Sequence, residues 1–586
     1  MKTGAKGKDE GAEMKDSRFK AVRVCRAVAL AMVCLLTLAG NVYAQTSSDG
    51  RDTNKESAPA ATPAPNHDGV PAANSTPKTT TEILAELESM RARIAELEAQ
   101  LKAQQSLGQP PARVSAAFPA KEPASAAAAS PVGTRETAVP TPADTKKLPK
   151  TEPFAFADFT WLNGNSREKD VPLDTKFFTP EVRVDVDYIY DFHNPKDDTI
   201  GGSSEVFRSS EVQLTQLGVG GDFHFDNVRG RLMTQFGLYS QTTPRNDASP
   251  ARGQWNLADA YRYISEAYGG YHFNKLHGIN VDAGIFMSYV GLFSYYQYDN
   301  WAYQPSYVSS NTPWFFNGVR VQIFPTEHLK IEPWFINGWQ SYGRFNGRPG
   351  LGVQILWRPN GWLSVLGNQY GVGEEALNTP GRVRYHSDDS IEVKYYDNQA
   401  RFLDKAAFSL TGDIGCEHGG GVSCYGNSTK GPKQSFLGFM LYNRTWFHKD
   451  MFGFTVGGGK INNPGRYLVL LPPINGATAA SGTPYFTENP GDPYKAWDMS
   501  TTFDYMPSQY ITFRWEANYR AANVPYFSGR GGVTPPGGNN GHPGSFTCLD
   551  GSVAATSTSC PPGVGLWTPD LRKNETRLNM AILVKF

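Results

Sequence analysis

The most reactive side chains in this sequence are its cysteines. Cys416 lies close to Cys424, and Cys548 lies close to Cys560, in stretches rich in Gly, Ser and Asn. Thiols of an exported chain are oxidised, so we expect two local disulfides in exposed loops. The alternative is a metal site on CEHGGGVSC that uses His418, but its spacing matches no standard zinc pattern. We therefore predict no metal site.

A glycine-rich stretch is the second candidate for chemistry. GGGKI at 457–461 resembles part of a phosphate-binding loop, but Ile461 stands where that loop needs Ser or Thr, and the stretch reads as a strand. The sequence contains neither H-E-x-x-H nor G-x-S-x-G. We expect no enzyme and no cofactor. A barrel hydrolase with catalytic residues on different strands is the alternative, because it would leave no local motif.

Charged residues that alternate with apolar ones form the third set of candidates. In EVRVDVDYIYDF (181–192) one face carries Val and aromatic residues, while the other carries mainly Arg and Asp. QYITFRWEANYR (509–520) divides in the same way. One face suits lipid and the other suits water. We expect these residues to line a polar interior: Arg183, Asp185, Asp187, Arg229, Arg231, Arg320, Lys394, Arg514, Glu516 and Arg520.

The mixed signs of these charges have two explanations. Opposed basic and acidic walls would create a field that orients dipolar solutes. The same residues could instead form salt bridges that hold a barrel wall together. The sequence leaves both explanations open and predicts no strong preference for anions or cations.

The alternating stretches predict the elements that position these residues. Sixteen strands are expected, with eighteen as the alternative, beginning near residues 180, 210, 228, 262, 279, 314, 329, 350, 361, 387, 405, 435, 451, 496, 509 and 574. Short turns such as HKD and MPS alternate with long connections at 240–261, 290–313, 413–434, 462–495 and 521–573. This pattern is typical of an outer-membrane barrel. The predicted fold is all-β, a transmembrane antiparallel up-and-down β-barrel.

Composition excludes some classes of partner. Lys plus Arg and Asp plus Glu both number 56 in 586 residues, so the chain has no basic surface suited to nucleic acid. Aromatic residues reach 12% and glycines number 59. No stretch beyond the N-terminus approaches the ~20 apolar residues of a spanning helix.

The first 44 residues have the pattern of a secretory signal peptide. Basic residues precede the apolar run AVALAMVCLLTLAG, and VYA ending at Ala44 is a small-residue cleavage site. Cleavage would leave 48 basic and 52 acidic residues, a net charge of −4, and would remove Cys25 and Cys34. A retained anchor is the alternative.

Two linkers follow, at 45–80 and 106–153, rich in Ala, Pro, Ser and Thr and without periodicity, and we expect them to be disordered. Residues 81–105 lie between them and carry apolar residues at spacings of four and three. This spacing is typical of a coiled coil. The residues of its seam are Ile83, Leu87, Met90, Ile94, Leu97 and Leu101. Residues 154–586 are assigned to the barrel.

The charges beside this seam favour self-association. In a parallel, in-register assembly Glu86 faces Arg91 of a neighbour, and Arg93 faces Glu98. We therefore expect a homo-oligomer. The mixed core favours a trimer over a dimer only slightly, and a single amphipathic helix is the alternative.

The chain ends on LNMAILVKF, a strictly alternating stretch. We expect it to be the closing strand of the barrel, with lipid on one side and Lys585 on the lumen side. The residues that share the lipid face are Leu578, Met580, Ile582, Val584 and Phe586. The terminal aromatic looks like the sorting signal that the barrel-assembly machinery reads, so Phe586 is the predicted assembly signal.

The middle of the chain resembles a known family. ISEAYGGYHF, INVDAGIFMSYVGLFSYYQYDNWAYQPSYVSSNTPWFFNGVRVQIFP and TFDYMPSQYITFRWEANYR are similar to the OmpL-like beta-barrel porin family. The resemblance covers roughly residues 154–586 and excludes the signal, linkers and coil. It implies a porin-like outer-membrane protein, and it carries no catalytic or binding residues with it.

By analogy with other porins, the loop at 291–312 is expected to fold into the pore as a constriction. Its aromatic residues could stack on sugar faces, with Asp299 and Asn300 as hydrogen-bond partners. The alternative is an interfacial girdle, or an outward loop that packs on a neighbour. The residues concerned are Tyr295, Tyr296, Tyr298, Asp299, Asn300, Trp301 and Tyr303.

Together these patterns predict an outer-membrane porin that passes small hydrophilic solutes passively through a polar lumen, with its N-terminal extension in the periplasm. The expected partners are outer-membrane lipid, the barrel-assembly machinery, small hydrophilic solutes and further copies of the chain. A non-conducting anchor that links the envelope layers through the coiled coil is the alternative.

Overall fold

The computed structural model describes residues 152–201, 206–247, 249, 253–344, 347–374, 381–463, 493–538 and 545–586. The predicted signal peptide, the linker at 45–80 and the coiled coil lie outside the described residues, as does nearly all of the second linker.

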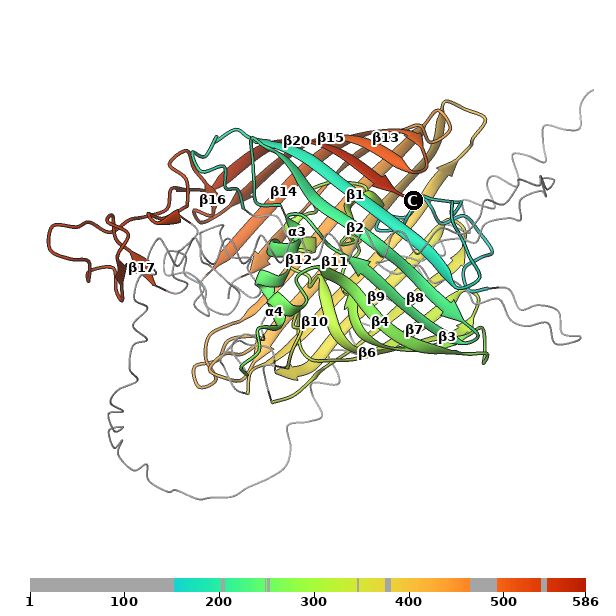
Figure 1. The fold of residues 1–586 in the computed structure, drawn as a ribbon, viewed down its shortest axis with the longest axis horizontal. Coiled ribbons are helices and arrows are strands. Elements are labelled where there is room, and N and C mark those ends of the chain that lie inside the picture. The colour runs from blue at the N-terminus through green and yellow to red at the C-terminus, as the bar shows by residue number, and fades with distance from the viewer. Residues whose placement is uncertain are drawn as a thin grey trace, which may run out of the picture. The chain divides into compact units, whose positions relative to one another are not determined.

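Sixteen antiparallel strands close into one barrel (Figure 1). Each strand pairs with the next barrel strand along the chain, and the last strand closes the ring against the first. The barrel strands are β1 (Phe178–Asp191), β2 (Val212–Phe225), β3 (Val228–Thr234), β4 (Ile264–Phe273), β5 (Ile279–Met287), β6 (Phe315–Thr326), β7 (Leu329–Ile336), β8 (Gly350–Asn360), β9 (Leu363–Glu374), β10 (Val383–Asp397), β11 (Leu403–His418), β12 (Ser435–Phe447), β13 (Phe452–Asn463), β14 (Tyr494–Ser508), β15 (Ile511–Ala522) and β20 (Asn574–Lys585).

The predicted fold class is confirmed, including the strand number of sixteen. Every barrel strand begins within four residues of its expected start. The largest difference is at β10, which begins at Val383 instead of 387. The alternating pattern located the strands well because one face of each strand must be apolar and the other polar along its whole length.

The remaining elements are short and lie in the connections. The helices are α3 (Tyr239–Thr242), η1 (Pro244–Asn246), α4 (Leu257–Ala260), η3 (Gln297–Asp299) and α5 (Tyr307–Ser310). Two small sheets lie between β15 and β20, formed by β16 (Phe527–Ser528) with β19 (Leu571–Arg572), and by β17 (Phe546–Thr547) with β18 (Val553–Ala554). Among the described residues, no helix has the length and apolar character needed to cross a membrane.

Two disulfides tie the longer connections. Cys416 at the end of β11 is bonded to Cys424, and Cys548 is bonded to Cys560 in the connection between β15 and β20. Both bonds close short loops, which is the pairing that the sequence predicted.

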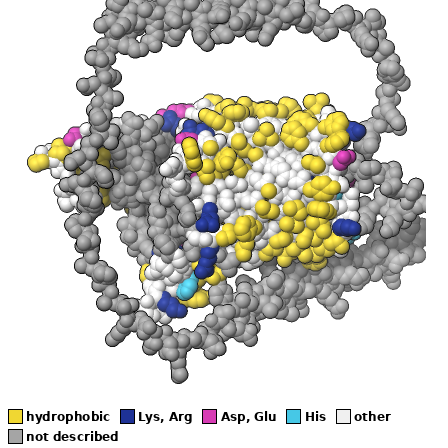
Figure 2. Space-filling model, turned by 60° about the horizontal axis from the view of Figure 1, so that its bottom comes forward, with side chains coloured by type: hydrophobic (Ala, Val, Ile, Leu, Met, Phe, Trp, Pro, Cys, Tyr) yellow, Lys and Arg dark blue, Asp and Glu magenta, His cyan; other side chains and the backbone are white. Residues whose placement is uncertain are grey.

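The two faces of β1 differ in the burial of their side chains. Its inward residues, from Thr179 to Asp191, are all buried, while the outward ones alternate with them and are more exposed. On β12, Leu437, Phe439 and Leu441 face outward and expose 49–60% of their surface. Figure 2 shows many apolar side chains over the barrel wall and charged side chains gathered at its two ends. This distribution suits a wall surrounded by lipid.

The end of the chain completes the ring. In β20, Val584 lies opposite Val184 of β1, and Phe586 exchanges two backbone hydrogen bonds with Val182, of 2.7 and 3.0 Å. The Phe586 side chain is 45% exposed on the outside of the barrel. Its backbone pairing and its outward ring place the predicted assembly signal at the closing seam.

Deletion of Phe586 is expected to lower the yield of membrane-inserted barrel more than it lowers secretion. The deletion removes both the terminal aromatic and its two hydrogen bonds to Val182. Fractionation of cells, with heat-modifiability on gels as the measure of inserted barrel, would test this. Phe586→Tyr is the control that keeps an aromatic terminus, and equal inserted yield for the deletion would refute the assignment.

Candidate functional site in the barrel interior

The connection between β5 and β6, residues 288–314, fills the interior of the barrel. Every one of these residues is buried. The backbone N–H groups of Tyr303 and Gln304 donate to the carboxylate of Glu516 on β15, at 2.6 and 2.9 Å. Asp498 on β14 accepts from the hydroxyl of Ser306 and the N–H of Tyr307, at 2.8 and 2.9 Å. We term residues 288–314 the inner loop.

Arginines of the barrel wall hold the carbonyl groups of the same loop. Arg514 donates to the carbonyl oxygens of Gln297 and Asn300, at 3.1 and 2.6 Å. Arg520 donates to the carbonyl of Pro305 at 2.6 Å, and Arg444 to that of Trp301 at 3.2 Å. Since a loop inside a barrel cannot pair with a sheet, wall side chains satisfy its backbone instead.

The aromatic side chains of the inner loop pack against other protein groups and are not exposed to solvent. The hydroxyl of Tyr296 donates to Glu266 at 2.7 Å, and that of Tyr303 donates to Asp185 at 3.1 Å. Burial, followed by the nearby carboxylate charge, raises the pKa of both phenols, so both remain protonated donors. Tyr295, Tyr296, Tyr298, Trp301 and Tyr303 are each at most 6% exposed.

This packing bears on the predicted role in sugar stacking. The loop folds inward, as one of the two expectations had it, but its ring faces contact protein groups. The guanidinium of Arg183 lies 4.0 Å from the ring centre of Tyr296, and the carboxylate of Asp299 pairs with Arg183 at 3.0 Å. In this conformation the rings act as anchors of the loop, and a solute would need the loop to move before it could stack on them.

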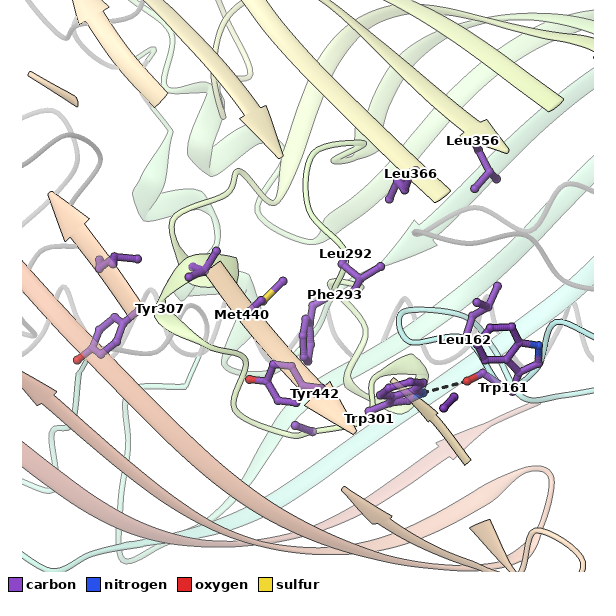
Figure 3. Close-up of a cluster of buried hydrophobic side chains, with 14 of the residues drawn as sticks. Trp161, Leu162, Leu292, Phe293, Trp301, Tyr307, Leu356, Leu366, Met440 and Tyr442 are labelled. Atoms are coloured by element: carbon purple, nitrogen blue, oxygen red, sulfur yellow. Dashed lines mark hydrogen bonds between the residues drawn. The ribbon is translucent and has the colours of Figure 1, made fainter. Parts of the chain in front are cut away.

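A second segment inside the barrel lies before the first strand. Residues 152–170, which we term the strap, pack against the inner loop (Figure 3). The indole N–H of Trp301 donates to the carbonyl of Trp161 at 3.2 Å, and the backbone N–H of Trp301 donates to the Asn163 side chain at 2.8 Å. At Gly164, with φ of 72°, an added Cβ would lie 2.3 Å from the carbonyl oxygen of Leu292. The two segments therefore fit closely.

The strap spans the end of the barrel that carries the short turns. On one side, the N–H of Phe154 donates to the carbonyl of Glu327 at 2.8 Å, in the turn between β6 and β7. On the other side, Arg167 donates to Thr512 of β15 at 3.0 Å, and Glu168 pairs with Lys585 of β20 at 3.0 Å. Since β6 and β7 lie across the ring from β15 and β20, the strap crosses the mouth.

Contacts in the middle of the strap hold it in place inside the barrel. The indole N–H of Trp161 donates to the carbonyl of Gly361 at 3.1 Å, and the N–H of Asn163 donates to Glu392 at 2.8 Å. The buried guanidinium of Arg358 lies 5.0 and 4.5 Å from the ring centres of Phe154 and Phe159. These contacts combine hydrogen bonds with cation–π attraction, so the strap is held by specific interactions with the wall.

The predicted lumen residues lie on the inward face. Arg231 of β3 is paired with Glu181, Asp222 and Glu266, at 3.1, 3.0 and 3.0 Å, and all four side chains are buried. The other predicted residues on inward strand positions are Arg183, Asp185, Asp187, Arg229, Arg320, Arg514, Glu516 and Arg520. The ion pairs that Arg231 makes with neighbouring strands are of the kind that the salt-bridge explanation predicts for the barrel wall.

Lys394 has a different setting from the other predicted residues. It lies at a register shift of β10, near the mouth, where its ammonium is 2.6 Å from Asp397 and 5.7 Å from the ring centre of Trp161. It therefore faces the strap instead of an open lumen.

Sequence reasoning missed several groups that the interior uses. Examples are Arg358 and Arg444, which hold the strap and the inner loop, and Asp282, which pairs with Arg320 at 3.0 Å. The strap itself was assigned to the barrel from residue 154 without a role. Its signal was the aromatic-rich FAFADFTWLNG, which directly follows a Pro-rich linker.

Among the residues that the structure describes, no group of three or more His, Cys, Asp or Glu side chains is arranged to hold a metal ion. Cys416 and Cys424 are bonded to each other, which removes both thiolates from the CEHGGGVSC stretch.

Similar solved structures are outer-membrane barrels. OmpT of Vibrio cholerae is 9% identical with a TM-score of 0.38, over 71% of this chain and 100% of that one. The channel DcaP of Acinetobacter baumannii is 12% identical with a TM-score of 0.37, over 70% and 97%. The anion-selective porin from Comamonas acidovorans is 11% identical with a TM-score of 0.35, over 70% and 99%. No curated protein matches the sequence significantly.

The sequence profile of one family matches residues 181–546, which is more than half of the chain. That family is described as "Putative beta-barrel porin-2, OmpL-like", and the matched range begins in β1 and extends past β15. This range includes the stretches that carried the resemblance in the sequence, from ISEAYGGYHF to TFDYMPSQYITFRWEANYR. The chain belongs to this family of OmpL-like beta-barrel porins.

Proposed function

We propose that this protein is an outer-membrane channel for the passive diffusion of small hydrophilic solutes, closed in its resting state by the inner loop and the strap. The observation that supports it best is the division of the barrel wall. The inward positions of β1, β15 and β20 carry mostly charged and amide side chains, while their outward positions are mainly apolar. An apolar core would be the simpler way to fill a barrel that conducts nothing.

The closed state is proposed from the burial of the interior. Several charged residues of the inward face, such as Arg231 and Arg320, are paired with carboxylates of the wall, and the strap crosses the mouth with the short turns, which in outer-membrane barrels faces the periplasm. Movement of the strap would expose the inner loop and the polar wall to water. Solutes of either charge sign would then meet both acidic and basic groups.

A structural anchor is the second candidate function. It is favoured by the tight packing of the strap, since the strap would transmit force from an N-terminal extension directly to the turn between β8 and β9, to β10 and to β15. The proposed periplasmic extension and its coiled coil belong to both functions. In the anchor, the interior would stay closed under all conditions.

Planar-bilayer recording distinguishes the two functions. The purified full-length protein in 1 M salt is expected to give rare, small conductance steps, which become frequent when the strap is removed. A heat-modifiable, folded barrel that gives no steps with or without the strap would reject the channel and leave the anchor. Step size in KCl compared with larger organic ions would then measure the width of the opening.

A further inference from the structure

The outer wall of the barrel carries a polar patch in a place that lipid would normally cover. Asp389 lies in the middle of β10 and points outward, since its neighbours Asp388 and Ser390 are buried on the inward face. Gln369 of β9 and Ser387 of β10 lie directly opposite each other on the same outward face. We term Gln369, Ser387 and Asp389 the outer patch.

The three side chains of the outer patch form one connected group. The Gln369 amide donates to the Ser387 hydroxyl at 2.7 Å and to the Asp389 carboxylate at 3.1 Å. The Ser387 hydroxyl donates to the other oxygen of Asp389 at 3.0 Å. The backbone N–H of Asn368 adds a bond of 3.3 Å to the same carboxylate. The group is preorganised, yet Gln369 remains exposed.

Apolar residues surround the outer patch on both sides. On β8, Leu351 and Ile355 expose 43% and 44% of their surface, and on β11, Leu410 and Ile414 expose 41% and 47%. The outer patch is therefore an island at membrane depth and not part of the polar rim. A carboxylate that faces hydrocarbon is unfavourable, because neither water nor an ion is present to solvate it.

Glycines leave room beside the carboxylate. Asp389 lies between Gly367 on β9 and Gly412 on β11 in the strand register. A Cβ added to Gly412 would meet nothing within 4 Å, and one added to Gly367 would meet only the Asp389 carboxylate at 3.3 Å and a carbonyl at 4.0 Å. Glycine weakens a strand interior, and packing inside this chain does not demand it at Gly412. The flat surface lets another molecule approach the carboxylate.

We propose that the outer patch, with Gly367 and Gly412, is the contact between two copies of this chain in the membrane. An amide both donates and accepts, a hydroxyl does the same, and a carboxylate accepts, so the same group on a second copy can complement it. On contact, each Gln369 amide would exchange its bond to the Asp389 of its own chain for a bond to the Asp389 of its partner, which removes both groups from lipid without changing the number of bonds. The charged seam at 81–105 independently predicts self-association. This inference does not depend on conductance.

Cysteine cross-linking in intact outer membranes tests the contact. Leu410→Cys in the full-length chain, outward on β11 two residues from Gly412 and outside the outer patch, is expected to give a covalent dimer with a short bismaleimide, whereas Val184→Cys, outward on β1 across the barrel, is not. The native Cys416, Cys424, Cys548 and Cys560 are bonded in pairs, and the unsubstituted chain gives the background. Heat-modifiability on gels confirms that each variant has a folded barrel.

A second variant addresses the polar contact itself. Adding Gln369→Leu and Asp389→Leu to the Leu410→Cys chain is expected to lower the dimer yield severalfold while the barrel stays folded. The proposal is overturned if Leu410→Cys gives no dimer, if Val184→Cys gives as much, or if the product contains a different protein. An unchanged yield with the two leucines would also overturn it, since the polar group would then contribute nothing.

Discussion

Deletion of residues 152–166 is expected to raise the conductance of single channels severalfold over that of the full-length chain. The deleted part of the strap holds the contacts with Gly361, Glu392 and Trp301, and without it the mouth with the short turns is uncovered. The inner loop remains anchored by Glu516 and Arg514, so the channel should still be narrower than an empty barrel.

The matched control removes the same number of residues from the second linker, at 106–120. This deletion shortens the N-terminal extension equally but leaves the strap in place, so its conductance should equal that of the full chain. Asn163→Ala is a milder variant that removes the side chain accepting from Trp301 and should raise the frequency of opening. Equal step sizes for the strap deletion and the linker deletion would show that the strap does not limit conduction.

Replacement of Arg231 by Leu is expected to destabilise the folded barrel by about 3–5 kcal/mol, because it leaves buried carboxylates without their cation. Glu181, Asp222 and Glu266 all pair with this guanidinium within 3.1 Å. Denaturant unfolding of the barrel in detergent micelles, followed by tryptophan fluorescence, would measure the free energy of unfolding.

Arg208→Leu is the control for this measurement. Arg208 pairs with Glu211, but both side chains are more than one third exposed, at 37% and 34% of their surface, and lie outside the strands. An exposed ion pair contributes at most about 1 kcal/mol to stability, so the free energy of unfolding of the control should be close to that of the unsubstituted protein. A loss below about 1 kcal/mol for Arg231→Leu as well would show that the pairs of Arg231 are replaced by water or by neighbouring groups.

Charged side chains have two uses in this interior. Arg231 binds carboxylates on neighbouring strands and so stabilises the wall, whereas Arg520 binds a carbonyl group of the inner loop. Arg514 does both, since it pairs with Asp504 of β14 at 2.7 Å and binds the carbonyl of Asn300. The sequence predicted all three as lumen residues because each lies on the polar face of an alternating strand. It had no means of assigning their partners, since alternation specifies direction and not distance.

Only part of the structure of the inner loop could be predicted from the sequence. The analogy with other porins suggested an inward fold, with a girdle or an outward loop as the alternative, and the aromatic residues of the loop suggested ring stacking with a solute. In the structure those rings contact wall residues far away in the chain, such as Asp185 and Glu266. Loop conformation depends on such partners, and a loop has no periodicity from which they could be read.

The sequence by itself determined the kind of barrel: antiparallel strands of alternating side-chain direction, their starts to within four residues, and the closing role of the last strand, with sixteen strands expected and eighteen as the alternative. It could do so because lipid on one side and polar groups on the other impose a period of two on every strand. The tertiary structure decided what fills the barrel and what covers it. The strap meets Thr512 and Lys585 across the mouth, and Asp389 meets Gln369 on the outer wall, because folding brings these strands and segments together in space.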